Sequence, residues 1–211
     1  MVLRKIMGLF VCALVIGSAA FATAGIPDPT ETVATMPNAG LDDVVLFNLP
    51  SGIGSPFAEA QIKDDGAVVD ATITMTVRDA FAAVVANFPA EDMWLESNDG
   101  GMVPCDGGTT ADFNTNDDGE TSWVNPLNAG GFSEDVCVVY VNGLELNGAP
   151  FTLFFNSADI NGDGTVNILD VSQFSSSYFG AYAFAADFYA DGVLNVLDVG
   201  RLASGLGGSC P

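Results

Sequence analysis

Alternating apolar and polar residues predict that the chain between residues 43 and 156 is built from β-strands. From Val69 to Val77 every second residue is apolar, and the residues between them are Asp or Thr, which is typical of a strand with one buried face. An apolar run from Val136 to Val141 ends at Asn142-Gly143, a dipeptide that favours a tight hairpin turn. We expect further strands at residues 44–47, 57–62, 81–85, 93–95, 122–123 and 151–155.

The spacing of these strands predicts the fold class. Short strands separated by Gly, Asn and Asp turns favour a mainly β, antiparallel sandwich over residues 43–156. Such a region is large enough to bury a core, to which we expect Trp94 and several Phe residues to contribute. Residues 25–42 contain three prolines and little periodicity, so an exposed N-terminal segment is expected there.

In the last part of the chain, residues 157–211, the spacing of apolar residues changes from that of strands to that of helices. Asp159–Asp170 reads DINGDGTVNILD, and 28 residues later Asp187–Asp198 reads DFYADGVLNVLD. After each acidic loop, apolar residues recur at helical spacing. They are Val171, Phe174 and Tyr178 in the first copy and Val199, Leu202 and Leu206 in the second. The repeat predicts two loop–helix units packed against each other.

The first loop has the oxygen spacing that a hard cation needs. Alternate oxygen-bearing residues, a glycine at position 6 and a carboxylate at position 12 are the pattern of a Ca²⁺ loop. The alternative is a solvated acidic turn without metal, in which three close carboxylates would repel one another. The candidate ligands are the side chains of Asp159, Asn161, Asp163 and Asp170, the Thr165 carbonyl, and Asn167 directly or through water.

The second loop has the same charges but a different third position. Its candidate ligands are Asp187, Asp191, Asp198, Asn195 and the Val193 carbonyl. Tyr189 stands at position 3, so a water or a carbonyl must supply the missing oxygen. We therefore predict two calcium ions, with the second site weaker or empty.

The N-terminus predicts export. Arg4 and Lys5 precede an apolar run that ends at Ala22-Thr23-Ala24, and this order is typical of a signal peptide over residues 1–24. The alternative is an uncleaved membrane anchor. After cleavage no membrane insertion is expected, because no second apolar run is long enough to span a bilayer.

Charge narrows the range of partners. The formal net charge of the full chain is −22, from five basic and 27 acidic residues. The predicted signal peptide contains two of the basic residues and none of the acidic ones, so the net charge after cleavage is 3 − 27 = −24. Such a surface repels nucleic-acid phosphates and attracts divalent cations. Part of the charge also serves solubility.

Three cysteines follow the predicted cleavage site: Cys105, Cys137 and Cys210. In an oxidising compartment an odd number indicates one bridge and one remaining thiol. Cys105 and Cys137 lie in the same β-rich region, so we predict a disulfide between them. Cys210 is then expected to be free or to pair between chains.

The repeat resembles a known family. Two units of the form D-x-N-x-D-G-x-x-N-x-x-D, about 28 residues apart, are similar to a type I dockerin. This resemblance implies a small α-helical calcium-binding module at residues 157–211 that docks onto a cohesin-like protein domain. Positions 10 and 11 are apolar here, Ile168-Leu169 and Val196-Leu197. Docking onto the chain's own sandwich is the alternative.

The middle region resembles bacterial immunoglobulin-like domains of the invasin kind in the segments ATITMTVRDA, FPAEDMWL and TNDDGETSW. Together the two resemblances imply a secreted, non-catalytic surface or assembly protein. The alternative is a small glycoside hydrolase or carbohydrate-binding component of a dockerin-assembled complex, with polysaccharide as its partner. The chain has no histidine, the commonest general base. Paired carboxylates could hydrolyse glycosides, but no pair stands out among 27 acidic residues, so the sequence assigns no catalytic residue.

Overall fold

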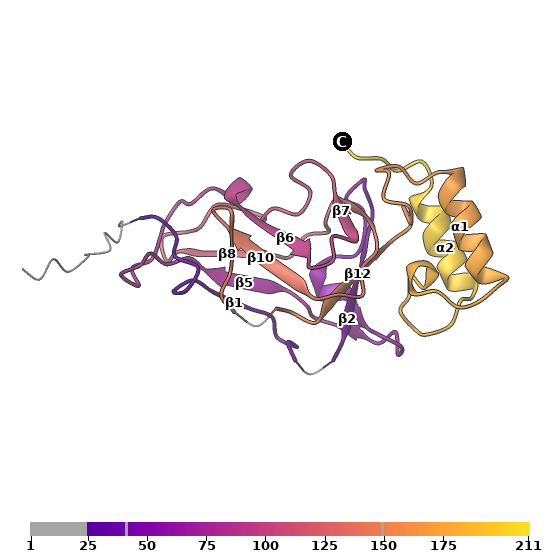
Figure 1. Cartoon of the computed structure of the whole chain (residues 1–211), viewed down its shortest axis with the longest axis horizontal. Helices are drawn as coiled ribbons and strands as arrows, with labels where there is room; N and C mark the ends of the chain where they lie inside the picture. Colours follow the sequence, from indigo (N-terminus) through magenta and orange to yellow (C-terminus); the bar gives the residue numbers. More distant parts are fainter. Residues whose placement is uncertain (1–24, 41, 149) are drawn as a thin grey trace, which may run out of the picture.

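A computed structural model describes residues 25–40, 42–148 and 150–211, and the predicted signal peptide lies outside these residues. The described part is mainly β, with two α-helices gathered at one end of an elongated molecule (Figure 1). The mainly β prediction is therefore confirmed. We refer to residues 157–211 as the C-terminal module.

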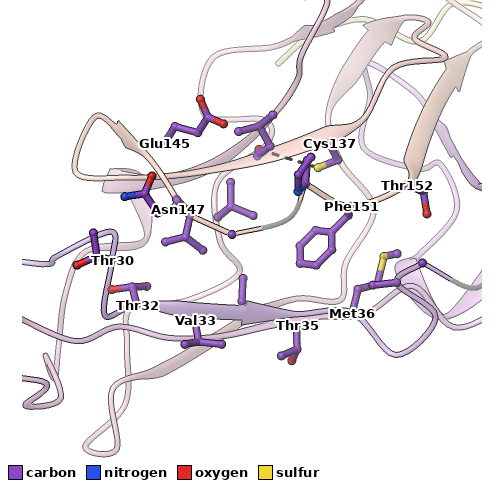
Figure 2. Close-up of a pocket in the computed structure, with 18 residues that line it drawn as sticks. Thr30, Thr32, Val33, Thr35, Met36, Cys137, Glu145, Asn147, Phe151 and Thr152 are labelled. Atoms are coloured by element: carbon purple, nitrogen blue, oxygen red, sulfur yellow. Dashed lines mark hydrogen bonds between the residues drawn. The ribbon is translucent and has the colours of Figure 1, made fainter.

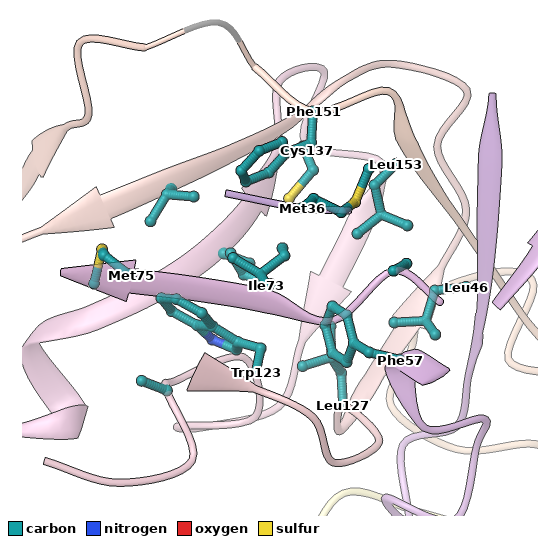
Figure 3. Packing of buried hydrophobic residues seen from close by; sticks show 14 of the residues in the cluster. Met36, Leu46, Phe57, Ile73, Met75, Trp123, Leu127, Cys137, Phe151 and Leu153 are labelled. Atoms are coloured by element: carbon teal, nitrogen blue, oxygen red, sulfur yellow. The ribbon is translucent and has the colours of Figure 1, made fainter. Parts of the chain in front are cut away.

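Two three-stranded sheets form the body of the sandwich. Their inward-facing residues belong to one apolar cluster, in which Ile73, Met75 and Trp123 of one sheet lie with Cys137 of the other (Figure 3). The first sheet has the order β1 (Val33–Thr35), β5 (Ile73–Thr76), β8 (Glu120–Trp123). The second has the order β11 (Leu144–Glu145), β10 (Cys137–Val141), β6 (Met93–Ser97).

Two further sheets close the end of the sandwich that faces the module. One has the order β12 (Leu153–Ser157), β2 (Val44–Asn48), β3 (Ala60–Ile62), β4 (Val68–Val69), and the other pairs β7 (Met102–Pro104) with β9 (Ala129–Gly131). β12 and β2 run parallel, so the expectation of a wholly antiparallel sandwich is wrong at this pair. Both strands are buried along their whole length, which fits the apolar runs 44–47 and 153–155 within them.

Several strand predictions need correction. Residues 57–62 begin with a 3₁₀ turn, η1 (Phe57–Glu59), before β3. Residues 81–85 form a turn instead of a strand, because the Asp79 carboxylate accepts from the N–H groups of Phe81 and Ala83 at 2.9 and 3.0 Å. The N-terminal segment is only partly exposed, since it contributes β1, which pairs with β5.

The tryptophan in the core is not Trp94, as predicted, but Trp123. Trp123 is fully buried, and its Nε1 donates to the Thr109 carbonyl at 3.0 Å. Trp94 lies half-buried on the outer face of β6, stacked on Tyr140 with ring centroids 5.3 Å apart. The core tryptophan is therefore Trp123, and Trp94 forms a cross-strand pair that supports the sheet from outside.

The module's helices follow the acidic loops as the spacing predicts. α1 (Ile168–Tyr178) and α2 (Val196–Gly205) are capped by Asn167 and Asn195, each in a capping box with the last loop carboxylate. This arrangement satisfies N–H groups that helix formation leaves unpaired. No helix in the described ranges is both long and apolar enough to cross a bilayer.

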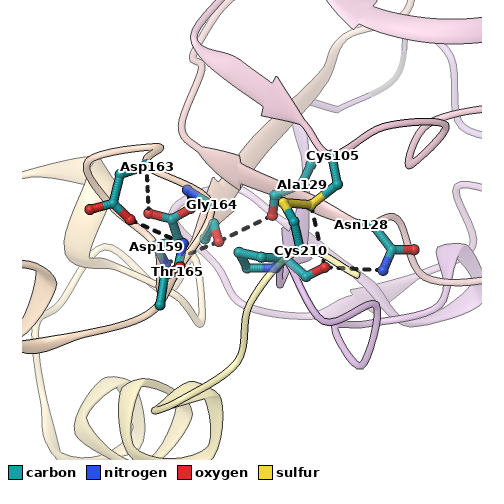
Figure 4. Close-up of a disulfide and its surroundings, with 10 residues drawn as sticks. Cys105, Asn128, Ala129, Asp159, Asp163, Gly164, Thr165 and Cys210 are labelled. Carbon is teal, nitrogen blue, oxygen red and sulfur yellow. Dashed lines mark hydrogen bonds between the residues drawn. A yellow bond between two sulfur atoms is a disulfide. The ribbon is translucent and has the colours of Figure 1, made fainter.

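The disulfide prediction is wrong. Cys105 is bonded to Cys210 (Figure 4), and Cys137 is a free, buried cysteine. Cys137 points into the core from β10, where burial raises the pKa of its thiol. Cys105 follows β7 at the end of the sandwich that faces the module, within reach of the C-terminus.

Candidate metal-binding loops

In loop one (Asp159–Asp170), the first and last carboxylates accept hydrogen bonds from the main chain of the loop. Asp159, at position 1, accepts from the main-chain N–H groups of positions 5 and 6 at 3.1 and 2.9 Å. Asp170, at position 12, accepts from those of positions 3 and 9 at 3.2 and 2.8 Å. Position 6 is Gly164 with φ +82°, a conformation that glycine adopts without steric cost.

The remaining predicted ligands of loop one meet in the same network. The Asp163 carboxylate accepts from the side-chain amides of Asn161 and Asn167 at 3.0 and 3.3 Å. The Asn167 amide also donates to the Thr165 carbonyl at 3.0 Å. The structure thus brings together all six residues that the sequence nominates in this loop.

Loop two (Asp187–Asp198) repeats this framework. Asp187 accepts from the N–H groups of positions 5 and 6 at 3.2 and 2.8 Å, and Asp198 from those of positions 3 and 9 at 3.1 and 2.9 Å. The Asn195 amide donates to Asp191 at 3.1 Å and to the Val193 carbonyl at 3.3 Å. Five of the six nominated residues therefore meet through their predicted groups.

The sixth residue, Tyr189, takes part in the framework only through its main chain. Its ring lies against Arg201, whose guanidinium carbon is 3.9 Å from the ring centroid. Sequence reasoning did not nominate Arg201. A signal was present, however, because Arg201 is the only basic residue of the module and stands where the first repeat has Gln173.

The loop carboxylates are buried and crowd one another. Asp159, Asp187 and Asp198 have no exposed surface. Burial raises the pKa of each of these carboxyl groups, and nearby carboxylates raise it further: Asp170 and Asp163 for Asp159, Asp198 for Asp187, and Asp191 for Asp198. A bound cation would offset both effects, because it supplies the opposite charge that burial removes.

The donor set of loop one fits calcium. Carboxylate, amide and main-chain carbonyl oxygens are the ligands that Ca²⁺ prefers, and neither loop offers the nitrogen or sulfur that softer metals select. Within the described residues no three Asp, Glu, His or Cys side chains already converge on one point. The carboxylates accept from loop N–H groups instead, so they must reorient to bind an ion. Loop two fits less well, since its third position lacks a side-chain oxygen directed into the loop.

Both loops are attached to the sandwich through their first residue. The Asp159 carbonyl accepts from the Gly131 N–H at 2.7 Å. The Asp187 carbonyl accepts from the Asn156 side-chain amide. Gly130 packs so closely on loop one that a Cβ atom there would lie 2.0 Å from Asp159 Oδ2.

Loop one is also attached through the end of the chain. The Cys210 N–H donates to the Gly164 carbonyl at 2.9 Å, and Thr165 pairs with Ser209. The disulfide to Cys105 then joins this tail to the sandwich (Figure 4). Loop one is therefore hydrogen-bonded to the C-terminal tail, and the tail is covalently bonded to the sandwich.

Apolar and basic side chains complete the boundary between the sandwich and the module. Phe47 of β2 packs on Phe188 with ring centroids 5.5 Å apart, inside a cluster that also contains Phe174 and Leu202. Lys63 lies 5.4 Å from the Phe154 ring of the sandwich and 5.7 Å from the Phe184 ring of the module. The module is thus packed against its own sandwich.

A cavity of about 480 Å³ lies elsewhere, between β1 and the chain following β10 (Figure 2). Apolar atoms of Met36, Cys137 and Phe151 line it, with threonine hydroxyl groups such as those of Thr32 and Thr35 nearby. None of the twelve predicted metal ligands is among its lining residues. The candidate metal chemistry therefore belongs to the module alone.

No protein-family model matches this chain, and no curated protein sequence matches it. Among solved structures, the crystal structure of the Lin-41 filamin domain is similar over 61% of this chain and 95% of that chain, at 14% identity and a TM-score of 0.31.

Proposed function

We propose that this protein is a secreted, non-catalytic surface or assembly protein whose dockerin-like module binds calcium and docks onto a protein partner. The observation that carries the proposal is the duplicated network of buried carboxylates around loop one and loop two. Its oxygen donors suit calcium, and burial penalises their charge while no ion is bound. The first loop binds calcium more tightly than the second, because only the first presents an oxygen-bearing side chain at position 3.

The partner contacts the exposed apolar residues at positions 10 and 11 of the loops. Ile168 and Val196 are 74% and 72% exposed, and Leu169 and Leu197 beside them are also exposed. Exposed apolar residues of this size on a soluble protein favour a protein interface. A cohesin-like domain with an apolar contact area is the partner that fits this chemistry.

The other side of the module already has a partner within the chain. Phe174, Phe188 and Leu202 are covered by contacts that include Phe47 and Leu49 of the sandwich. Intramolecular packing and external docking therefore use different residues. In this proposal the sandwich holds the module in a fixed orientation, and positions 10 and 11 face outwards.

Calcium titration of residues 25–211 by calorimetry tests the calcium part of the proposal. We expect the wild-type chain to bind calcium and Asp163→Ala to lose the tighter site. Asp118→Ala is the matched control, because it removes an exposed carboxylate from a turn outside both loops. The calcium proposal fails if the wild-type chain binds no calcium, or if Asp163→Ala and Asp118→Ala titrate alike.

A further inference from the structure

Two of the positions at which the repeat units differ are linked in space. The 28-residue offset matches Tyr189 with Asn161 and Arg201 with Gln173. In loop one the Asn161 side chain stays inside the network, where it donates to Asp163 at 3.0 Å. In loop two the corresponding tyrosine ring has left the network and lies on the arginine.

Arg201 is held at three points. Its guanidinium carbon lies 3.9 Å from the centroid of the Tyr189 ring and 4.9 Å from that of the Phe47 ring. One of its terminal nitrogens, Nη1, donates to the Phe188 carbonyl. Tyr189 and Phe188 belong to loop two, and Phe47 belongs to β2 of the sandwich. The side chain therefore joins the loop to the sandwich while keeping a positive charge, since an arginine stays protonated in proteins.

We propose that Arg201 is the resident cation of loop two: it lowers the calcium affinity of this loop and keeps it folded and docked on the sandwich when no calcium is bound. This inference rests on the proposed calcium-binding function and concerns how the two loops divide that function. Loop one is then the loop whose folding responds to calcium, and loop two holds the module on the sandwich without calcium.

Two physical effects lead to this division. Arg201 stands three residues after Asp198 in α2, and a fixed positive charge there repels a divalent ion more strongly than it repels a monovalent one. In addition, position 3 can contribute an oxygen only if Tyr189 leaves the guanidinium, and this would break a cation–π contact that is partly shielded from water. Gln173 is neutral and exposed, so neither effect operates at loop one.

The test exchanges the two residue pairs between the loops in the full chain and measures calcium binding by calorimetry. In the wild type we expect loop two to bind about tenfold more weakly than loop one. The double variant Tyr189→Asn, Arg201→Gln should bring the two affinities within about threefold of each other. The reciprocal variant Asn161→Tyr, Gln173→Arg should weaken loop one by about tenfold, and Arg201→Lys should keep the wild-type difference because it keeps the charge.

Hydrogen exchange with a chelator present supplies a second measurement. Loop two should stay protected in the wild type and lose protection in Arg201→Gln. The Arg201 proposal is overturned if loop two of the wild type binds as tightly as loop one, or if the double variant leaves the difference unchanged while loop one still binds. If neither loop binds calcium in any variant, the proposed function itself fails. The reciprocal variant covers the case in which Arg201→Gln does not fold, since Gln173 is an exposed position.

Discussion

Loop one and loop two share one hydrogen-bonding framework and are both attached to the sandwich through the carbonyl of their first residue, yet each loop has a second attachment of its own. Loop one is joined through the chain terminus, by pairing with Ser209 and by the Cys105–Cys210 disulfide. Loop two is joined through Arg201, which bridges Tyr189 and Phe47. A duplicated loop can therefore keep its backbone framework while the side chain at position 3 stays in the network in one copy and contacts Arg201 in the other. Four predictions test this difference.

The largest expected effect comes from removing the disulfide. Cys105 and Cys210 are 105 residues apart, and closing a loop of this size is worth about 4–5 kcal/mol of unfolding free energy. In denaturant unfolding, the variant Cys105→Ser, Cys210→Ser should have an unfolding free energy lower than that of the wild type by about this amount. Its calcium affinity should fall at loop one and not at loop two, since only loop one pairs with the released tail. Reductant should reproduce both effects in the wild type and change nothing in the variant.

Calcium removal should have the next largest effect. At a free calcium concentration about 100 times the Kd, binding stabilises the folded state by about 2.7 kcal/mol. Chelation should therefore lower the melting temperature and reduce hydrogen-exchange protection in loop one and α1. Protection of β5 and β10 in the sandwich should not change. Equal losses of protection in loop one and loop two would contradict the difference between them.

Gly130→Ala should destabilise the contact between the sandwich and loop one. The added Cβ would lie 2.0 Å from Asp159 Oδ2, and overpacking of this kind costs about 1–3 kcal/mol. Denaturant unfolding should show this loss, and calorimetry should show weaker calcium binding at loop one. Gly200→Ala is the control: it lies in α2 with no atom within 4 Å of the new Cβ, so it should stabilise the protein by up to about 1 kcal/mol.

Local signals in the sequence predicted much of this fold. The hairpin after β10 follows from Asn142-Gly143, and the helix starts follow from the asparagines that cap α1 and α2, because each depends on residues close in sequence. β1 was missed, since three residues in a proline-rich segment become a strand only through pairing with β5. The disulfide partner was wrong for the same reason: it depends on which ends of the fold meet in space. The replacement of the asparagine at position 3 by Tyr189 was readable from the repeat, whereas the contact of Tyr189 with Arg201 required the structure.

The smallest expected effect on stability belongs to the exposed apolar residues of the module. Ile168→Ser and Val196→Ser change side chains that are 74% and 72% exposed, so unfolding free energies should move by no more than about 0.5 kcal/mol. Calcium binding should also be unchanged, because neither side chain belongs to the oxygen network. Binding to a cohesin-like domain, measured by surface plasmon resonance, should weaken in both variants. The size of the two losses shows which loop the partner uses. Equal losses indicate a partner that contacts both loops, and a loss at Ile168 alone places the partner on loop one.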